Sequence, residues 1–258
     1  MLKKTLLTMF CLFGFLLTHA TAHADPPQFN VLLFSKMDGF HHKAVNEGVT
    51  AMRKLSQKHH FSIDWHEDSG VFTDERLARY DAVVFLLTTG NILNEEQQGA
   101  MKRFIQAGNG FVGIHSASDT HYDWEWYTKL VGRMFVIHPP IQTAQLEVLD
   151  SNFPGMESMP ERFWLTDEYY EFGPEKIEGL NYLLAVDEST YDPSADWGRV
   201  SGDGMGDFHP LAWYHEYDGG RSFYTALGHV PALYEDDLFL EHVFGGLLWA
   251  ATGKGISK

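Results

Sequence analysis

Short apolar runs alternate with helical segments through the first half of the chain, and this alternation constrains the fold most strongly. Residues 42–58 have apolar positions at helical spacing, and residues 94–107 start at a capping Asn94 and stop before Gly108. The strand candidates between and around them are 29–35, 61–65, 81–87 and 110–115. Strands separated by helices pair in parallel, with the helices on both faces of the sheet. We therefore predict an α/β fold with a mostly parallel sheet.

The second half is less regular. Residues 211–217 and 221–227 flank Asp218-Gly219-Gly220, which predicts a hairpin. The other predicted elements are strands at 142–149 and 182–186, an acidic and aromatic segment at 163–172, a long loop at 191–208 and a terminal helix at 238–251. We see neither a repeat nor a linker, so residues 25–258 are predicted to form a single domain with long loop insertions.

Residues 1–24 have the pattern of a secretory signal peptide. Lys3 and Lys4 precede an apolar run at 5–17, and Ala22-His23-Ala24 is a small-residue cleavage site. The apolar run is too short for a comfortable membrane span, so we expect no stable membrane anchor. Cleavage removes Cys11, the only cysteine. An exported protein without thiols fits an oxidising compartment, and we predict a periplasmic location.

Charge excludes one class of partner. The chain has 19 Lys and Arg against 35 Asp and Glu, which gives a net charge of −16. Binding to a phosphate backbone requires clustered basic residues, so we expect no nucleic-acid partner.

Histidines gather where the predicted strands end. Ligands of parallel α/β sheets bind at the carboxyl ends of the strands, and imidazole can act as base, acid or metal ligand. The candidates beside a Gly, a Pro or a strand end are His41, His115, His138, His209 and His229. By contrast, His42 opens a predicted helix and is interpreted as a cap. No pair among these candidates has the i, i+4 spacing of a helical zinc site, so a divalent metal is compatible with the pattern, although the spacing does not indicate one.

His115 stands at a strand-to-helix turn where hydrolases carry a nucleophile. A Ser or Cys at this position would predict acyl transfer, but the segment 111–117 places His115 there and Ser116 one residue later. The chain also has no Gly-x-Ser-x-Gly sequence. These two observations argue against a Ser–His–acid hydrolase.

Carboxylates and aromatic residues offer a second kind of site. Asp167 and Glu168 lie among aromatic residues that include Tyr170, and Trp213 follows in a later strand. Proteins hold sugars by stacking aromatic faces on the ring and by accepting hydroxyl hydrogen bonds with carboxylates. Packing in the core and a solvated turn are the alternative explanations for the same residues.

The chain resembles the ThuA-like (trehalose utilisation) family over residues 29–253. The resemblance rests on segments at 40–41, 110–119, 130–139, 167–170, 209–213 and 221–229. It implies a class I glutamine-amidotransferase-like fold, a flavodoxin-like three-layer sandwich. That superfamily usually has a Cys where this chain has His115, so glutamine amidotransferase activity is not expected. The family is linked to trehalose, related disaccharides and their 3-keto derivatives.

Together these observations predict an exported enzyme of carbohydrate metabolism that acts on a glycoside or keto-sugar by acid–base chemistry. The predicted catalytic residues are His41, His115, Asp119 and Glu168. The predicted substrate-binding residues are Trp124, His138, Tyr170, His209, Trp213 and His229, and the five candidate histidines could instead hold a metal ion. Two alternatives stay open: a sugar-binding protein without catalysis, and a structural partner of a secreted oxidoreductase complex.

Overall fold

A large mixed sheet forms the centre of the computed structural model, which describes residues 25–173 and 178–255. The predicted signal peptide at 1–24 lies outside the described residues. The strands of this sheet are β1 (Asn30–Phe34), β2 (Ser62–His66), β3 (Ala82–Leu86), β4 (Gly110–Ile114), β6 (Gln142–Val148), β7 (Arg162–Asp167), β9 (Asn181–Asp187), β12 (Pro210–Tyr217) and β13 (Gly220–Thr225). Their order is β2-β1-β3-β4-β13-β12-β9-β6-β7.

One half of the sheet is parallel, as the alternation of strands and helices predicts. The pairs β1–β2, β1–β3, β3–β4 and β4–β13 all run in parallel. The helices between these strands are α1 (Val45–His59), α2 (Asp74–Leu77) and α3 (Glu95–Gln106). Helix α3 begins with a capping box, because Asn94 accepts from the Gln97 amide and the Gln97 side chain accepts from that of Asn94.

The other half is antiparallel, so the sheet is mixed and the mostly parallel prediction covers only part of it. The pairs β12–β13, β9–β12, β6–β9 and β6–β7 are antiparallel. Parallel neighbours need a crossover connection, and within the described part of this half the only helical segment is the short η3 (Glu188–Thr190). The predicted hairpin at Asp218-Gly219 joins β12 to β13 directly.

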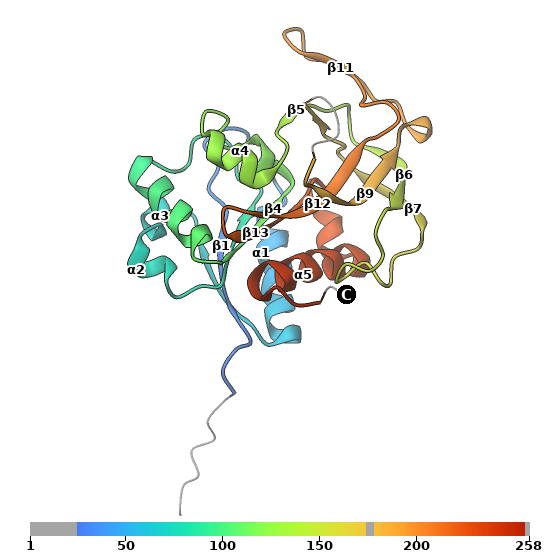
Figure 1. The fold of residues 1–258 in the computed structure, drawn as a ribbon. Coiled ribbons are helices and arrows are strands. Elements are labelled where there is room, and N and C mark those ends of the chain that lie inside the picture. The colour runs from blue at the N-terminus through green and yellow to red at the C-terminus, as the bar shows by residue number, and fades with distance from the viewer. Residues whose placement is uncertain (1–24, 174–177, 256–258) are drawn as a thin grey trace, which may run out of the picture.

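Two small antiparallel strand pairs occupy segments for which the sequence predicted no regular strand. Strand β5 (Phe135–Ile137) pairs with β8 (Glu171–Phe172). Strands β10 (Ser194–Asp196) and β11 (Ser201–Asp203) pair within the stretch that was predicted to be a long loop. This β10–β11 hairpin extends beyond the end of the central sheet (Figure 1).

Helices cover both faces of the sheet, with α1 and α5 on one side and α2, α3 and α4 on the other (Figure 1). The remaining helical segments are α4 (Glu125–Val131), α5 (Asp237–Thr252), η1 (Ser69–Val71), η2 (His115–Asp119) and η4 (Pro231–Glu235). Helix α5 lies directly on β4, since a Cβ on Gly110 would come within 2.4 Å of the Ala250 backbone. Among the described helices, none has the length and apolar character that a membrane span requires.

Candidate functional site

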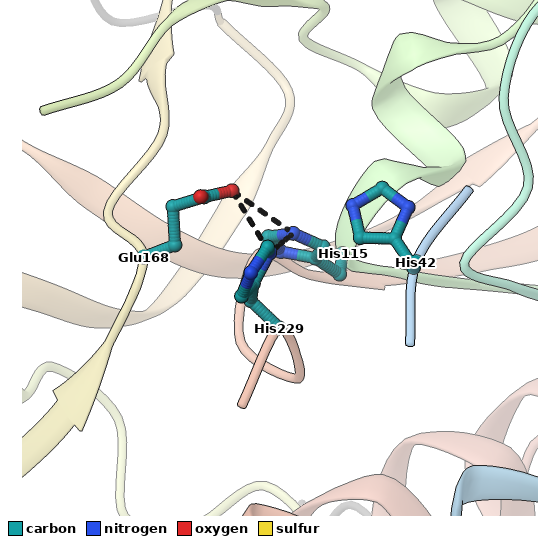
Figure 2. Close-up of side chains that lie close together, drawn as sticks. All are labelled: His42, His115, Glu168 and His229. Atoms are coloured by element: carbon teal, nitrogen blue, oxygen red, sulfur yellow. Dashed lines mark hydrogen bonds and ion pairs between the residues drawn. The ribbon is translucent and has the colours of Figure 1, made fainter. Parts of the chain in front are cut away.

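Four side chains from distant parts of the sequence meet near the carboxyl ends of the parallel strands: His42, His115, Glu168 and His229 (Figure 2). They follow β1, β4, β7 and β13 respectively. One nitrogen or oxygen atom from each of them lies within 4.8 Å of the others. We call these four residues the histidine cluster.

His115 is fixed at a tight turn between β4 and η2. Its φ angle of 52° is in the left-handed region, which is strained for a residue with a side chain. Its Nδ1 lies 2.6 Å from the carbonyl oxygen of Ala226 and therefore donates a proton to it. In the neutral ring, Nε2 then carries the lone pair, and it faces His229 Nδ1 at 3.2 Å and Glu168 Oε2 at 3.4 Å.

Glu168 is the acidic member of the cluster and is almost completely buried. Its Oε2 lies 3.0 Å from His229 Nδ1, and its Oε1 lies 3.3 Å from Nδ1 of His138. Burial acts to raise the pKa of Glu168, but hydrogen bonds from His115 and His229, with the charges of His115 and His138, hold it well below its ordinary value. Glu168 is therefore a carboxylate surrounded by imidazoles.

Asp167 holds the loop that carries His229. Its two carboxylate oxygens accept from the backbone N–H groups of Gly228, at 2.7 Å, and Val230, at 3.0 Å, on either side of His229. For His229, burial acts to lower the pKa, but the hydrogen bond and charge of Glu168 together with the charge of Asp167 raise it. The sequence placed Asp167 beside Glu168 but did not predict this positioning contact.

The structure places His42, not His41, in the cluster. His41 is exposed, whereas His42 is 7% exposed and its Nδ1 lies 3.3 Å from the Ser116 hydroxyl. Burial, with the charges of His115 and His229, lowers the pKa of His42 to about 2. His42 lies ahead of α1 and makes no helix cap, because the cap position of that helix is Ala44.

A cavity of about 370 Å³ opens above the cluster. Its lining combines three cluster members with six other side chains: Phe40, His42, Asp119, Phe135, His138, Glu168, Tyr170, Trp197 and His229. Of the predicted site residues, Asp119, His138, Glu168, Tyr170 and His229 thus share one cavity, and His115 lies directly beneath it. Sequence reasoning did not select Phe40, Phe135 or Trp197.

Asp119 and His138 are the proton-carrying groups on the cavity wall. Oδ1 of Asp119 accepts from the Tyr122 hydroxyl at 2.8 Å, and burial raises the pKa of this carboxyl in spite of that bond and of the charge of His115. Burial lowers the pKa of His138, although the charge of Glu168 opposes the shift. The raised pKa makes the Asp119 carboxylate a stronger base than a solvent-exposed one, and the lowered pKa makes a protonated His138 a stronger acid.

Aromatic rings form the rest of the wall and the mouth. The Tyr170 ring packs at 4.2 Å from the His115 ring and at the same distance from Phe135. Trp197, in the turn of the β10–β11 hairpin, lies edge-on to His138 at 4.8 Å and is 52% exposed. Phe40 is also exposed. These are the surfaces on which a flat or ring-shaped ligand would pack.

Three residues predicted to bind substrate do not line this cavity. Trp213 is fully buried and donates to the Val131 carbonyl. Trp124 packs on the rings of Trp126 and Tyr127 at the start of α4. His209 is buried behind the wall, where its ring nitrogens lie 2.9 Å from the Tyr170 carbonyl and 2.6 Å from Glu188. Trp213 faces inward because the first half of β12 is buried on both faces of the sheet, and His209, just before β12, is held by Glu188 and the Tyr170 carbonyl. Sequence alone reveals neither arrangement.

Comparison with known proteins identifies the family. The model of the ThuA family, described as trehalose utilisation, matches residues 30–250. The chain belongs to the ThuA family. Among curated proteins, no sequence matches it significantly.

Solved structures share the fold. A ThuA-like protein from Bacteroides uniformis is 20% identical, with a TM-score of 0.72 over 92% of this chain and 98% of that one. A second, from Parabacteroides merdae, is 21% identical, with a TM-score of 0.70 over 91% and 93%. A β-galactosidase from Bacillus circulans sp. alkalophilus aligns with 84% of this ThuA-family chain but only 30% of its own length, at 16% identity and a TM-score of 0.52. At these identities the likeness describes the fold alone.

Proposed function

We propose that this ThuA-family protein is an exported enzyme of carbohydrate metabolism that acts on a keto-sugar or glycoside by acid–base chemistry. The observation that carries the proposal is the cavity, in which Asp119 and His138 face the same space as Phe40 and Trp197. Aromatic faces suit the apolar face of a sugar, and the carboxylates and imidazoles suit its hydroxyl groups and protons. Its flavodoxin-like layout and its periplasmic location belong to the same proposal.

A 3-keto glycoside fits this chemistry. The ketone acidifies the hydrogen on the carbon between itself and the anomeric carbon, so a modest base can remove it. We assign the base to Asp119, because its Oδ2 is left for a ligand while Oδ1 is held by Tyr122. The histidine-rich floor stabilises the negative charge that moves onto the ketone oxygen.

Two outcomes of proton removal balance without an oxidant. In elimination, the C–H bond breaks, a carbon–carbon double bond forms and the glycosidic C–O bond breaks. The departing oxygen then takes a proton, for which His138 is placed beside Glu168. In isomerisation, the same proton returns to the enediolate at the neighbouring carbon and no bond to the second sugar breaks.

Hydrogen exchange tests the proposal before any product is identified. The purified protein is incubated in D₂O with 3-keto-trehalose and other keto-glycosides, with and without a divalent metal, and followed by NMR and mass spectrometry. We expect deuterium at the carbon next to the ketone, and loss of at least about 100-fold in exchange rate in Asp119→Asn. The control is Asp192→Asn, an exposed carboxylate whose contacts are to Ser194.

The same experiment separates the proposal from its main alternative. Calorimetry on trehalose and the keto-glycosides measures binding independently of turnover. Tight binding without exchange or product in any of these sugars would favour the non-catalytic sugar-binding protein and contradict an enzyme.

A further inference from the structure

We infer that His42, His115, Glu168 and His229 bind one divalent first-row transition metal ion at the floor of the cavity. The inference deepens the proposed function, because it names the group that would receive the ketone oxygen. Metal binding itself can be measured without any sugar, so the two proposals can fail separately.

The donor atoms converge as a metal site requires. Four potential ligand atoms lie within 4.8 Å of one another, a spacing that small shifts of side chains can close around one ion. Figure 2 shows Glu168 and His42 on opposite sides of His115 and His229, with Glu168 in contact with both of these central histidines. Three of the donors are imidazoles and one is a carboxylate.

Each donor is oriented by a contact on its other side. The Ala226 carbonyl takes the Nδ1 proton of His115, which leaves Nε2 for the ion. The Ser116 hydroxyl lies against Nδ1 of His42, which likewise leaves Nε2 on the side of the cluster. Outer contacts of this kind fix the tautomer and direction of metal-binding histidines.

The other two donors are supported in the same way. Asp167 holds the backbone on both sides of His229, and His138 contacts the Glu168 oxygen that faces away from His229. The carboxylates of Asp167 and Glu168 are both buried, so water competes little for their hydrogen bonds. The cluster is therefore supported from outside at all four positions.

The ligand types select the class of ion. Imidazole nitrogen suits zinc, iron, cobalt, nickel and copper, whereas calcium and magnesium prefer oxygen ligands. Three nitrogens and one carboxylate oxygen therefore favour a transition metal ion.

The position of the cluster leaves one side open. His42, Glu168 and His229 line the cavity, whereas His115 lies below it with no exposed surface. An ion held here would keep a coordination position toward the cavity, as ions in catalytic sites do. It would draw negative charge onto a bound ketone or hydroxyl oxygen, beside the Asp119 carboxylate.

The alternative is that the cluster shares protons and binds no metal. The Glu168 carboxylate already lies within 3.4 Å of His115 and His229, and an imidazolium could satisfy it. Elemental analysis of protein purified without chelator distinguishes the two, together with cobalt(II) titration of chelator-treated protein followed by visible absorption and calorimetry.

We expect one equivalent of metal per chain and a saturable cobalt spectrum. His42→Ala and Glu168→Gln should weaken metal binding by more than about 100-fold, beyond the roughly 10–100-fold that loss of an outer contact costs. The control is His41→Ala, which removes the neighbouring exposed imidazole and should leave the affinity unchanged.

The results that overturn the inference are equally definite. Wild-type protein whose circular dichroism shows it to be folded, but which neither retains metal nor binds cobalt, zinc or manganese at a single site, excludes the site. Equal affinity in wild type, His42→Ala and Glu168→Gln also excludes it. Neither result changes what deuterium exchange into the keto-glycoside shows in buffer without added metal. The proposed function is therefore tested independently of the metal site.

Discussion

At the scale of single residues, Asp167 links the fold to the histidine cluster. In Asp167→Asn, one of the two backbone N–H groups that flank His229 loses its acceptor inside the protein. An unsatisfied buried donor costs about 1–3 kcal/mol, so we expect the free energy of unfolding in urea to fall by that amount. The exposed Asp192→Asn should change it by less than about 0.5 kcal/mol. Equal effects of the two substitutions would contradict the positioning role.

His121 gives the protein a pH dependence that is independent of the cluster. This buried ring accepts at Nε2 from the Leu93 N–H, and burial lowers its pKa from 6.5 to about 4. Above pH 6.5 the ring is neutral in both the folded and the unfolded chain, so its contribution to the free energy of unfolding is fully present. As the pH falls from 6.5 towards 4, the unfolded chain takes up a proton that the folded chain does not, and stability is lost.

The measurement is urea unfolding at several pH values between 7 and 4, for wild type and His121→Gln. The amide oxygen of Gln can accept from the Leu93 N–H but does not titrate. The free energy of unfolding of the variant should therefore fall less steeply with decreasing pH, and the two slopes should differ by up to about 1.4 kcal/mol per pH unit. His42 and His242, whose pKa values burial also lowers, keep part of the slope in both proteins. Parallel curves would show that His121 does not stay neutral in the folded state.

Single positions also show where sequence reasoning stops. His41 and His42 are adjacent and lie outside any helix or strand, so no periodicity indicates which of them points inward. Strand ends located His115 and His229 near one another because β4 and β13 are parallel neighbours that end at one edge of the sheet. The same reasoning selected Trp213, whose strand is covered on both faces.

At the scale of elements, the β10–β11 hairpin supplies a wall of the cavity. Trp197 in its turn is half exposed and contacts His138 and Phe135. Trp197→Ala should weaken sugar binding or raise KM by about 2- to 10-fold, the size expected for an aromatic contact of about 0.5–1.5 kcal/mol, and should leave the free energy of unfolding unchanged. Trp164→Ala is the matched control, because Trp164 is 60% exposed and does not line the cavity. The same KM in both variants would remove the hairpin from the site.

The elements of the first half were predictable, and those of the second half only partly. Strands β3 and β4 are completely buried and read as continuous apolar runs, and the capping box at Asn94 locates the start of α3. Strands β7 and β8 and the β10–β11 hairpin are short or only partly covered, so their sequences lack a clear period. Antiparallel pairing of β6, β7 and β9 depends on contacts across the sheet that no local pattern encodes.

At the scale of the whole molecule, the site exists only when both halves of the sheet are formed. His42 and His115 come from the parallel half, and Glu168 follows β7 at the far antiparallel edge. Strand β13 lies between β4 and β12, where the two halves meet. The loop after β13 therefore brings His229 into contact with both His115 and Glu168. The functional centre is thus a property of the assembled sheet and of no single segment.

The most direct test of the account is kcat/KM on a 3-keto glycoside for wild type, His42→Ala and His41→Ala. The structure predicts a loss of at least about 100-fold for His42→Ala, because a cluster member is removed, and a change of less than about twofold for His41→Ala. Equal activities of the two variants, or a wild-type protein that turns over no keto-glycoside with or without metal, would contradict it.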